Sequence, residues 1–392
     1  MSATPVESQP MIPRAGLAPG CPAHAGPDGV WKIQDYATAR AFLREAGTRQ
    51  AGFNAENVHR VSAKMRVPVL YRDGAEHREH RKQTARYFTP KRVDTAYRDM
   101  MNRLAGEQCA ELRRRGEADL ADLSFKLAVA VAAEVVGLTD AGRGMSRRLD
   151  NFFAEQGNPG WRHPIKAVRT LLGQFNLGFF YYFDVRPSIR ARRRERRDDL
   201  ISHLLDEGCT GPEILGECVT FAAAGMITTR EFIVVAAWHL LTDPELRERY
   251  VQAGEKERFG ILHEILRVEP VVSNLYRRTT ADIAAGDRTI PAGALVDVGV
   301  AAANLDPAAV GADPGAVCPA RPVADGVGEA GLSFGDGAHR CPGAYIAIQE
   351  SDIFLSKLLA EPGLELVQEP TVRIRPEIAA YKLVGLRLRV RG

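Results

Sequence analysis

One stretch near the C-terminal end constrains this chain most: Leu332–Ala344, which reads LSFGDGAHRCPGA. Gly335 and Gly337 flank an aspartate there, and glycines so placed suit a backbone with positive φ or a close approach to a flat ligand. Cys341 follows, then Pro342, a residue favoured at the first position of a helix. The apolar residues beyond it recur at helical spacing. We therefore expect Cys341 where a glycine-rich loop becomes a helix, because the helix dipole and free N–H groups stabilise a thiolate there.

A thiolate in this position could bind iron, attack an electrophile or remain an inert buried cysteine. His339 could pair with Cys341 as a metal ligand, but zinc needs further clustered ligands and the sequence contains no Cys-x-x-Cys. The whole run Phe-Gly-x-Gly-x-His-x-Cys-x-Gly is far more specific. It resembles the haem-binding loop of the cytochrome P450 family, the haem-thiolate monooxygenases. The resemblance implies that Cys341 is the axial ligand of the haem b iron and that Phe334, Gly335, His339 and Gly343 help to bind the haem.

A second motif lies in Glu76–Arg81, shortly before Phe-Thr-Pro. His77 and Arg81 are four residues apart, so they share one face of a helix and could clamp a carboxylate. A solvated, charged helix face is the commoner explanation for such a run, and the residue pattern alone favours it. The run is similar, however, to the family's helix that meets the haem propionates. The resemblance gives that role to His77 and Arg81 and leaves His80 as a surface residue.

The third motif is Thr220–Glu231, inside a helical pattern that runs on to Leu241 before Thr242-Asp243-Pro244 breaks it. Small residues in this motif would let a planar ligand approach the backbone. Packing against another helix explains small residues equally well, with the Thr228 hydroxyl bonded back to a carbonyl one turn earlier. The stretch resembles the family's distal helix, Ala-Gly-x-acid-Thr-Thr, which crosses the oxygen side of the haem. Ala224, Gly225 and Thr228 match that pattern, and the resemblance implies that they border the bound dioxygen.

The distal pattern fails at one position, where the chain has Ile227 instead of an acid. In the family, this acid and the threonine together deliver protons, and isoleucine cannot relay a proton. Glu231, three residues beyond Thr228, could substitute through water or could be a surface residue. The route of proton delivery therefore stays open.

Two further motifs follow the distal helix in the sequence. Glu264-x-x-Arg267 would ordinarily be a surface ion pair of little worth. It resembles the family's buried Glu-x-x-Arg pair, and Arg321 is our candidate for the third member of that structural cluster. Arg277 occupies the family position that binds a haem propionate, and Arg278 is the neighbour that a slip of one residue would select.

The resemblance spans nearly all of the 392 residues and implies a mainly α, single triangular cytochrome P450 domain, with a small β-rich part, over residues 28–392. Residues 1–27, rich in Pro, Ala and Gly, are expected to form a loose arm. A hydrophobic content of 45% is enough for a sizeable core. Helices are expected over Asp35–Ala46 and through Val93–Leu138, and a β-hairpin within Leu364–Val390. Within Val93–Leu138 the apolar residues expected to be mostly buried are Leu104, Leu112, Leu120, Leu123, Leu127 and Val131.

Composition excludes some classes of partner. The net charge of +3 is small for this length and does not indicate nucleic acid. Arg186–Arg197 is dense in arginine, but its place before an amphipathic segment favours a solvated helix. Six scattered cysteines are typical of a reducing compartment. The N-terminal region contains no long apolar run for a signal or a membrane anchor. We expect a cytoplasmic monomer that binds neither nucleic acid nor membrane.

The expected function is activation of dioxygen to hydroxylate or epoxidise a small organic molecule. Electrons would come from a separate ferredoxin-type carrier, which Arg340 beside the loop could help to receive. Two alternatives remain: a non-standard oxidation, peroxide-driven or coupling, which Ile227 suggests, and a non-catalytic haem protein. Substrate contacts are expected in Asn54–Val69, Trp161–Phe183, the distal helix, Val271–Leu275 and the C-terminal hairpin, but they do not reveal the substrate.

Overall fold

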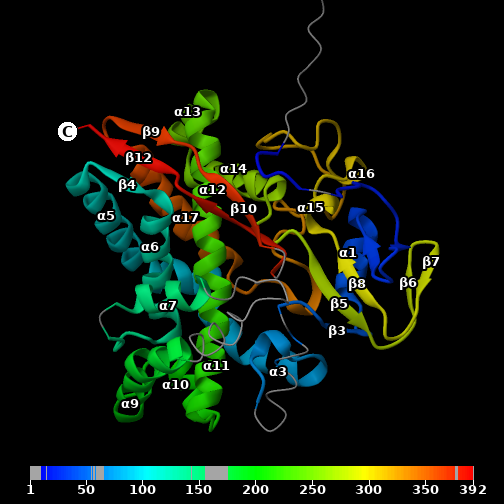
Figure 1. Ribbon diagram of the computed structural model, residues 1–392, viewed down its shortest axis with the longest axis horizontal. Coiled ribbons are helices and arrows are strands. Elements are labelled where there is room, and N and C mark those ends of the chain that lie inside the picture. Colours follow the sequence, from blue (N-terminus) through cyan, green and yellow to red (C-terminus); the bar gives the residue numbers. More distant parts are fainter. Residues whose placement is uncertain are drawn as a thin grey trace, which may run out of the picture.

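The computed structural model describes residues 10–14, 16–53, 55, 58, 66–142, 144–154, 175–375 and 378–391. Helices fill most of the molecule, while a smaller part built from strands lies on the right in Figure 1. The helices are α1 (Tyr36–Arg44), α3 (Gly74–Thr84), α4 (Pro90–Arg92), α5 (Arg98–Arg115), α6 (Leu120–Val136), α7 (Met145–Ala154), α9 (Arg186–Arg194), α10 (Leu200–Asp206), α11 (Gly211–Ala222), α12 (Thr228–Thr242), α13 (Pro244–Gln252), α14 (Glu255–Val268), α15 (Val300–Ala303), α16 (Pro307–Val310) and α17 (Ala344–Leu359). Short 3₁₀ or π segments are η1 (Val69–Tyr71), η2 (Ala85–Phe88), η3 (Val93–Tyr97), η4 (Tyr181–Val185), η5 (Ala223–Ile227) and η6 (Gly337–His339). The predicted mainly α fold is confirmed.

One long helix passes through the middle of the molecule (Figure 1). It is formed by α11, η5 and α12 without interruption. By length and composition alone, this helix of 32 residues is long and apolar enough to cross a membrane. Much of it is core helix, since every residue from Thr229 to Leu240 is buried. It ends at Thr242, as predicted, because Asp243 accepts the Glu245 and Leu246 N–H groups and so caps α13.

The main core lies where α12 packs against α6, α14 and α17, and α5 packs against α6 and α17. The predicted helical run Val93–Leu138 contains two main helices, because Gly116 ends α5 at φ +72 and β4 (Glu117–Asp119) separates it from α6. The apolar residues predicted to be buried in this run are buried, namely Leu104, Leu112, Leu120, Leu123, Leu127 and Val131.

The strands form four small sheets. The largest has the order β1 (His24–Ala25), β2 (Trp31–Ile33), β8 (Leu295–Val298), β5 (Leu275–Thr279) and β3 (Thr48–Gln50), with β2 and β8 parallel. β6 (Ile283–Ala285) pairs with β7 (Arg288–Ile290). The predicted C-terminal hairpin is β10 (Thr371–Arg375) with β11 (Ala380–Val384), while β9 (Leu364–Gln368) and β12 (Arg387–Val390) join β4 in a separate sheet.

The predicted loose arm, residues 1–27, is packed against the domain wherever the structure describes it. Residues 1–9 and 15 lie outside the described residues. Ile12 is only 2% exposed, and the N–H groups of Met11 and Ile12 donate to Glu269. Arg14 pairs with the same carboxylate at 3.4 Å. The buried Glu269 needs these donors, and they hold the described part of the arm in place.

Candidate functional site

The Cys341 loop is closed by its own backbone. The Cys341 N–H donates to the Phe334 carbonyl at 2.8 Å, and α17 begins three residues later at Ala344. The helix therefore starts two residues beyond Pro342, which we had expected at its first position. Gly337 has φ +66, and a Cβ there would overlap the Leu43 carbonyl oxygen. Glycine is thus required at this position by both conformation and space.

Cys341 is an exposed residue, although its thiol lies among protein groups. Burial raises the pKa of the Cys341 thiol, while the Gly343 N–H and the charges of Arg81 and Arg340 act in the opposite direction. These donors and cations are the ones that would stabilise a thiolate. A metal ion at the sulfur would complete the deprotonation. The site therefore has the chemistry of a metal–thiolate ligand.

The loop is held against α1 by a charged contact that sequence reasoning missed. Asp336 pairs with Arg40 at 3.1 Å and with Arg44 at 3.0 Å, and it accepts the Gly337 N–H. Burial alone would raise the pKa of Asp336, but these donors hold it below its usual value. The two arginines lie four residues apart on the predicted helix, so their shared face was visible in the sequence but their partner was not.

The helix α3 and the Cys341 loop meet through two histidines. His77 is 2% exposed and stacks on His339 with ring centroids 4.1 Å apart. His339 Nε2 lies 3.0 Å from Asp73 Oδ1. Burial, together with the charges of His339 and Arg81, lowers the pKa of His77 to about 4. His77 thus lies among cations and away from water, and a nearby anion would relieve both penalties.

Two arginines extend this cluster. Arg81 donates to the Arg340 carbonyl at 2.6 Å and so lies at the Cys341 loop. Arg277 is 4% exposed and donates to the Gln50 side chain. Burial lowers the pKa of Arg277 to about 10, opposed by the charge of Asp73. Arg278 instead donates to the Gly293 carbonyl in an exposed contact, so Arg277 is the inward-facing member of the pair.

These side chains fit haem b. Arg277 is a deeply buried guanidinium whose hydrogen bonds go to neutral oxygens, those of Gln50 and the Tyr276 backbone. Together with Arg81 and the two histidines it forms a cationic group near a single acid, Asp73. The two propionate groups of haem b would supply the missing negative charge, and burying a charge without a partner is costly.

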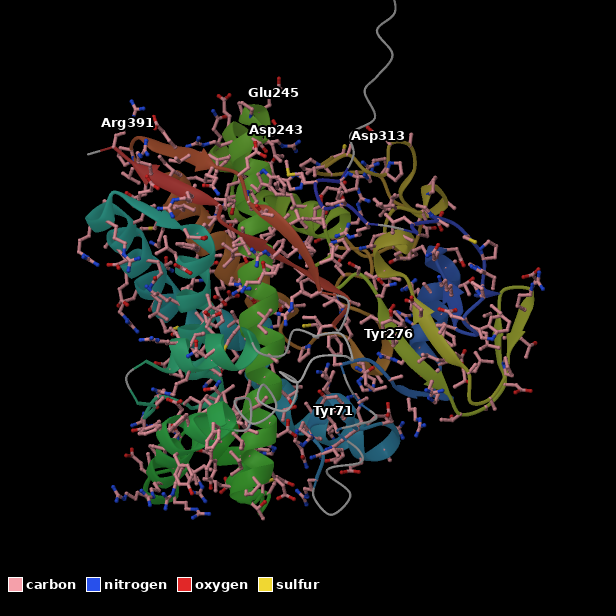
Figure 2. All side chains as sticks on the ribbon, viewed as in Figure 1. Tyr71, Asp243, Glu245, Tyr276, Asp313 and Arg391 are labelled. Atoms are coloured by element: carbon pink, nitrogen blue, oxygen red, sulfur yellow. The ribbon has the colours of Figure 1, made fainter. Side chains whose placement is uncertain are left out.

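The short segment 50–53 connects the two halves of this cluster. The Ala51 N–H donates to the Tyr276 carbonyl, and the Tyr71 hydroxyl donates to the Phe53 carbonyl at 3.1 Å. Tyr71 and Tyr276 both appear on the right-hand side of Figure 2. The segment therefore ties the strand that carries Arg277 to the turn that precedes α3.

A cavity of about 220 Å³ lies beside the Cys341 loop. It is lined by Arg81, Thr84, Ala85, Phe88, Thr89 and Pro342. The end of α3, η2 and the residue after Cys341 thus border one space.

The central helix has a π-helical segment, η5, at the predicted distal motif. Ala224 is exposed although its neighbours Ala222 and Met226 are buried. The Thr228 hydroxyl donates to the Ala224 carbonyl, as the helix-packing interpretation predicted, and Thr228 is also partly exposed. π segments inside helices are frequent at functional sites. Accessible surface in the middle of a core helix suits a flat ligand crossing it at Ala224 and Gly225.

Glu231 is not a surface residue, and both of its carboxylate oxygens are hydrogen-bonded. It is fully buried, pairs with Arg230 and accepts the Leu383 N–H of β11 at 2.8 Å. Burial raises the pKa of Glu231, opposed by Arg230 and the Leu383 N–H. Oε2 therefore connects the central helix to the C-terminal hairpin, while Oε1 accepts from Arg230 of the same helix. Ile227 is partly buried against an apolar cluster that includes residues of α6 and α11.

The structure brings the predicted Glu264 cluster together. Arg267 Nε lies 2.7 Å from Glu264 Oε2, and Arg321 Nε lies 2.9 Å from Glu264 Oε1. Burial alone would raise the pKa of Glu264, but Arg267, Arg321 and the Cys318 N–H hold it below its usual value. Arg267 also donates to the Asn304 carbonyl at the C-terminal end of α15.

The prediction that His80 is a surface residue was wrong. His80 is 7% exposed, and its Nε2 lies 3.6 Å from Glu217 Oε1 on α11. Arg72 lies 3.6 Å from the same oxygen, and the Val69 N–H donates to it. Burial raises the pKa of Glu217 to about 7. Nothing in the run Glu76–Arg81 indicated this contact, because its partner is 137 positions away in the sequence.

Two of the predicted substrate segments lie largely outside the described residues. Of Asn54–Val69 the structure describes residues 55, 58 and 66–69, and of Trp161–Phe183 it describes residues 175–183. Val271–Leu275 is described, and Val272 forms a bridge with Ala380 at the start of β11. This bridge brings two of the predicted substrate segments together.

Comparisons with known proteins agree with this geometry. A family model, described as Cytochrome P450, matches residues 260–379. The erythromycin C-12 hydroxylase of Saccharopolyspora erythraea is 27% identical over 364 residues, which cover 88% of this chain and 85% of the hydroxylase. The cyclomarin C epoxidase CymV of Salinispora arenicola is 30% identical over 296 residues, which cover 73% of this chain and 71% of the epoxidase.

Solved structures share the fold. P450BioI, in complex with hexadec-9Z-enoic acid ligated acyl carrier protein, has a TM-score of 0.78 and 23% identity, with 94% of both chains covered. The hydroxylase HmtN has a TM-score of 0.77 and 25% identity, with 96% of this chain and 95% of HmtN covered.

Proposed function

The chain belongs to the cytochrome P450 family and is a monooxygenase with haem b as its cofactor, and on this premise we propose that it hydroxylates or epoxidises a small organic molecule. One observation carries the proposal. Cys341 lies at the end of a backbone-closed loop, where the Gly343 N–H and the charges of Arg81 and Arg340 favour its thiolate. A thiolate ligand of this kind favours cleavage of the O–O bond of bound dioxygen.

We assign the residues that hold haem b as follows. Cys341 binds the iron, Phe334, Gly335 and Gly343 shape the loop beneath the haem, and the cationic cluster binds the propionates. The cluster consists of His77, Arg81, Arg277 and His339. Its support is the pair of arginines, Arg81 and Arg277, together with the stacked histidines at the meeting point of α3, β5 and the loop. When bound, the haem supplies dioxygen activation and oxygen transfer to a C–H or C=C bond.

On the opposite side we assign Ala224, Gly225 and Thr228 to the wall of the oxygen site. Ala224 is exposed at the π segment, so the helix backbone can border a small ligand there. The Thr228 hydroxyl donates to the Ala224 carbonyl, and its oxygen retains acceptor capacity for a water or a substrate hydroxyl. Ile227 cannot donate a proton, and Glu231 is hydrogen-bonded to the hairpin. Protons would therefore reach this site through water held at Thr228.

The partners follow from the same assignment. We propose a ferredoxin-type electron carrier that docks near Arg340, which is exposed beside the thiolate, in a cytoplasmic, monomeric protein with a single domain over residues 28–392. The carrier would be acidic, because Arg81 and Arg340 both lie at the Cys341 loop.

The experiment that tests this function uses the haem-loaded protein with a ferredoxin, its reductase and isotopically labelled dioxygen. Erythromycin, corticosterone and hexadec-9Z-enoic acid serve as probes, since proteins of this fold have been crystallised with erythromycin B, with corticosterone and with that acyl chain. Labelled oxygen in a product whose formation requires the carrier supports the proposal. Product formed only with peroxide, or without incorporated oxygen, would favour the non-standard oxidation instead.

A further inference from the structure

One helix has a solvent-facing side of unusual composition. It runs through helical residues 175–180, η4 and α9 without interruption. The stripe that faces the protein is buried and consists of Phe180, Asp184, Val185, Ser188, Ile189 and Arg192. The opposite stripe contains only aromatic residues and arginines at helical spacing. We call it the aromatic–arginine face, and it consists of Phe175, Phe179, Tyr182, Phe183, Arg186, Arg190, Arg193 and Arg194.

The aromatic half of this face is exposed to an unusual degree. Phe175 is 63% exposed, Phe179 50%, Tyr182 60% and Phe183 53%. Every other aromatic side chain whose burial the structure describes is less exposed than these four. Phe179 and Phe183 stack with centroids 6.0 Å apart, so the rings form a contiguous patch. Soluble proteins seldom leave such a patch uncovered unless it binds something.

The arginine half is charged and unbalanced. Arg190, Arg193 and Arg194 are exposed, and they form no ion pair with any residue that the structure describes. The inward arginine of the same helix behaves differently: Arg192 pairs with Asp199 and with Asp140. The acids near this helix therefore neutralise the buried arginine and leave the outward ones available to an external anion.

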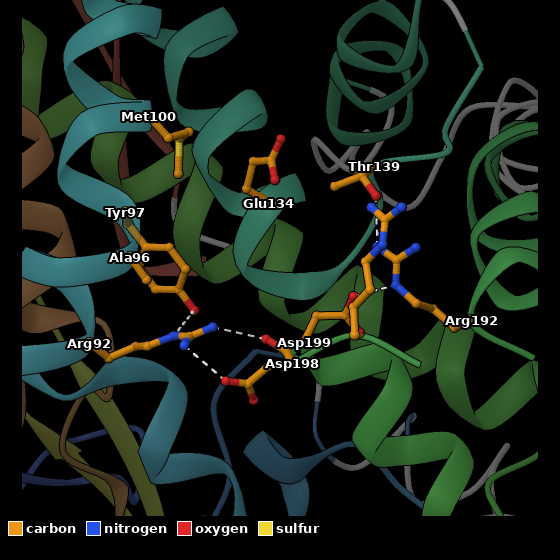
Figure 3. Close-up of a pocket in the computed structure, with 10 residues that line it drawn as sticks. Arg92, Ala96, Tyr97, Met100, Glu134, Thr139, Arg192, Asp198 and Asp199 are labelled. Carbon is orange, nitrogen blue, oxygen red and sulfur yellow. Dashed lines mark hydrogen bonds and ion pairs between the residues drawn. The ribbon is translucent and has the colours of Figure 1, made fainter. Parts of the chain in front are cut away.

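The helix is fixed firmly enough to present this face. Figure 3 shows Arg192 bonded to Asp199 and to Thr139 at the wall of a cavity of about 220 Å³. In the middle of the helix, Arg148 Nε lies 2.8 Å from the buried Asp184, and the Arg148 guanidinium lies 5.6 Å from the centre of the Phe183 ring. Both ion-pair anchors act on the inward stripe and Phe183 stays 53% exposed, so the outward stripe can contact a partner without refolding.

The pattern along the helix favours a protein over a membrane. A helix that lies in a membrane interface places its apolar and charged residues on opposite sides of the axis. Here both kinds share one side and are separated along the axis, with aromatics from 175 to 183 and arginines from 186 to 194. Each half spans roughly 12 Å. Aromatic residues and arginine are also the types enriched in the energetically important parts of protein interfaces.

We propose that the aromatic–arginine face is the docking site of an acidic protein domain, distinct from the electron carrier, whose surface has an apolar patch beside a group of carboxylates. The two patches would match the two halves of the helix. α9 lies at the lower left edge of the molecule in Figure 1, where a second protein can approach it.

The experiment begins with the full haem-loaded chain carrying the photo-crosslinking residue p-benzoylphenylalanine in place of Phe179, irradiated in its native cells. The protein it captures is then purified, and its dissociation constant for the unmodified chain is measured. Arg190→Glu/Arg194→Glu should weaken that binding by about tenfold or more, and increasingly so at low salt. Phe179→Ser should weaken it at every salt concentration. Arg103→Glu/Arg114→Glu makes the same charge change on exposed positions of α5 and should have little effect.

Three further measurements separate the competing occupants. Reduction of the haem by ferredoxin should be unchanged in Arg190→Glu/Arg194→Glu, which distinguishes this surface from the electron-carrier site. The proposal would be overturned if no protein were captured. It would also be overturned if the captured protein bound Arg190→Glu/Arg194→Glu as tightly as the unmodified chain. Binding of the chain to phosphatidylglycerol vesicles would also overturn the proposal if Arg190→Glu/Arg194→Glu abolished that binding. The same holds for self-association of the chain measured in the ultracentrifuge.

Discussion

At the scale of single residues, Cys341 decides the chemistry. Cys341→Ser should remove the red-shifted absorption band that thiolate ligation gives to the reduced, carbon-monoxide-bound haem, because a neutral hydroxyl is a poor substitute for a thiolate. Cys318→Ser is the matched control, since Cys318 is also exposed but lies outside the loop. A Cys341→Ser protein that kept the thiolate band would contradict the assignment.

Ile227 is the residue at which this chain departs from the family pattern. Ile227→Asp should raise the product formed per reductant consumed severalfold, because an acid there could pass protons to the oxygen side of the haem. Glu231→Gln should leave this ratio unchanged and lower stability instead. Its carboxylate accepts from Arg230 and Leu383, and hydrogen bonds to a charged group contribute about 1.5–3 kcal/mol. A loss of coupling in Glu231→Gln would show that Glu231 relays protons after all.

Glu350 on α17 gives a prediction of pH dependence. Burial raises the pKa of Glu350 to about 8, and its Oε1 has no hydrogen-bond partner. From about pH 5 to pH 8 the folded chain therefore keeps a proton that the unfolded chain releases. The contribution of Glu350 to the free energy of unfolding should fall as pH rises through this window, by at most about 4 kcal/mol.

Glu350→Gln should remove this slope, since an amide does not titrate. Chemical denaturation at several pH values measures the effect, and Glu248→Gln, an exposed glutamate on α13, serves as the control. An identical pH slope in wild type and Glu350→Gln would mean that Glu350 is ionised in the folded protein at low pH.

At the scale of elements, the Glu264 cluster joins α14 to the segment that carries Arg321. Glu264→Gln should destabilise the protein by about 3–5 kcal/mol, because it leaves buried guanidinium groups without their counter-charge. Glu257→Gln on the same helix breaks an exposed pair with Arg249 and should cost less than about 1 kcal/mol. Thermal unfolding of the haem-loaded variants compares the two, and equal losses would show that the cluster has no special structural role.

At the scale of the whole molecule, haem should connect three separate parts of the chain: α3, β5 and the Cys341 loop. Free haem at a hundred times its dissociation constant should stabilise the fold by about 2.7 kcal/mol. Arg277→Ala should weaken haem binding by about tenfold or more, because it removes a charge-assisted hydrogen bond to a propionate. Titration of the haem-free protein, followed by thermal unfolding, measures both effects. Haem that binds Arg277→Ala as tightly as wild type would remove Arg277 from the propionate site.

The sequence by itself determined what depends on spacing along the chain. The loop around Cys341, the shared face of His77 and Arg81, and the Glu264-x-x-Arg267 pair are local patterns, so their residue types and intervals were sufficient. The end of the central helix at Thr242 followed from the capping residue and proline after it. Helical periodicity likewise identified the buried leucines of α5 and α6, because burial follows one face of a helix.

Only the tertiary structure decided which distant groups meet. Periodicity shows which side of a helix is buried, but it does not show what lies opposite. For that reason Asp336 was not paired with Arg40, His80 was placed at the surface instead of against Glu217, and the support that Glu231 gives to β11 was not foreseen. In each case a buried charge had to find its counter-charge or donor, and the fold supplied that partner from a remote part of the chain.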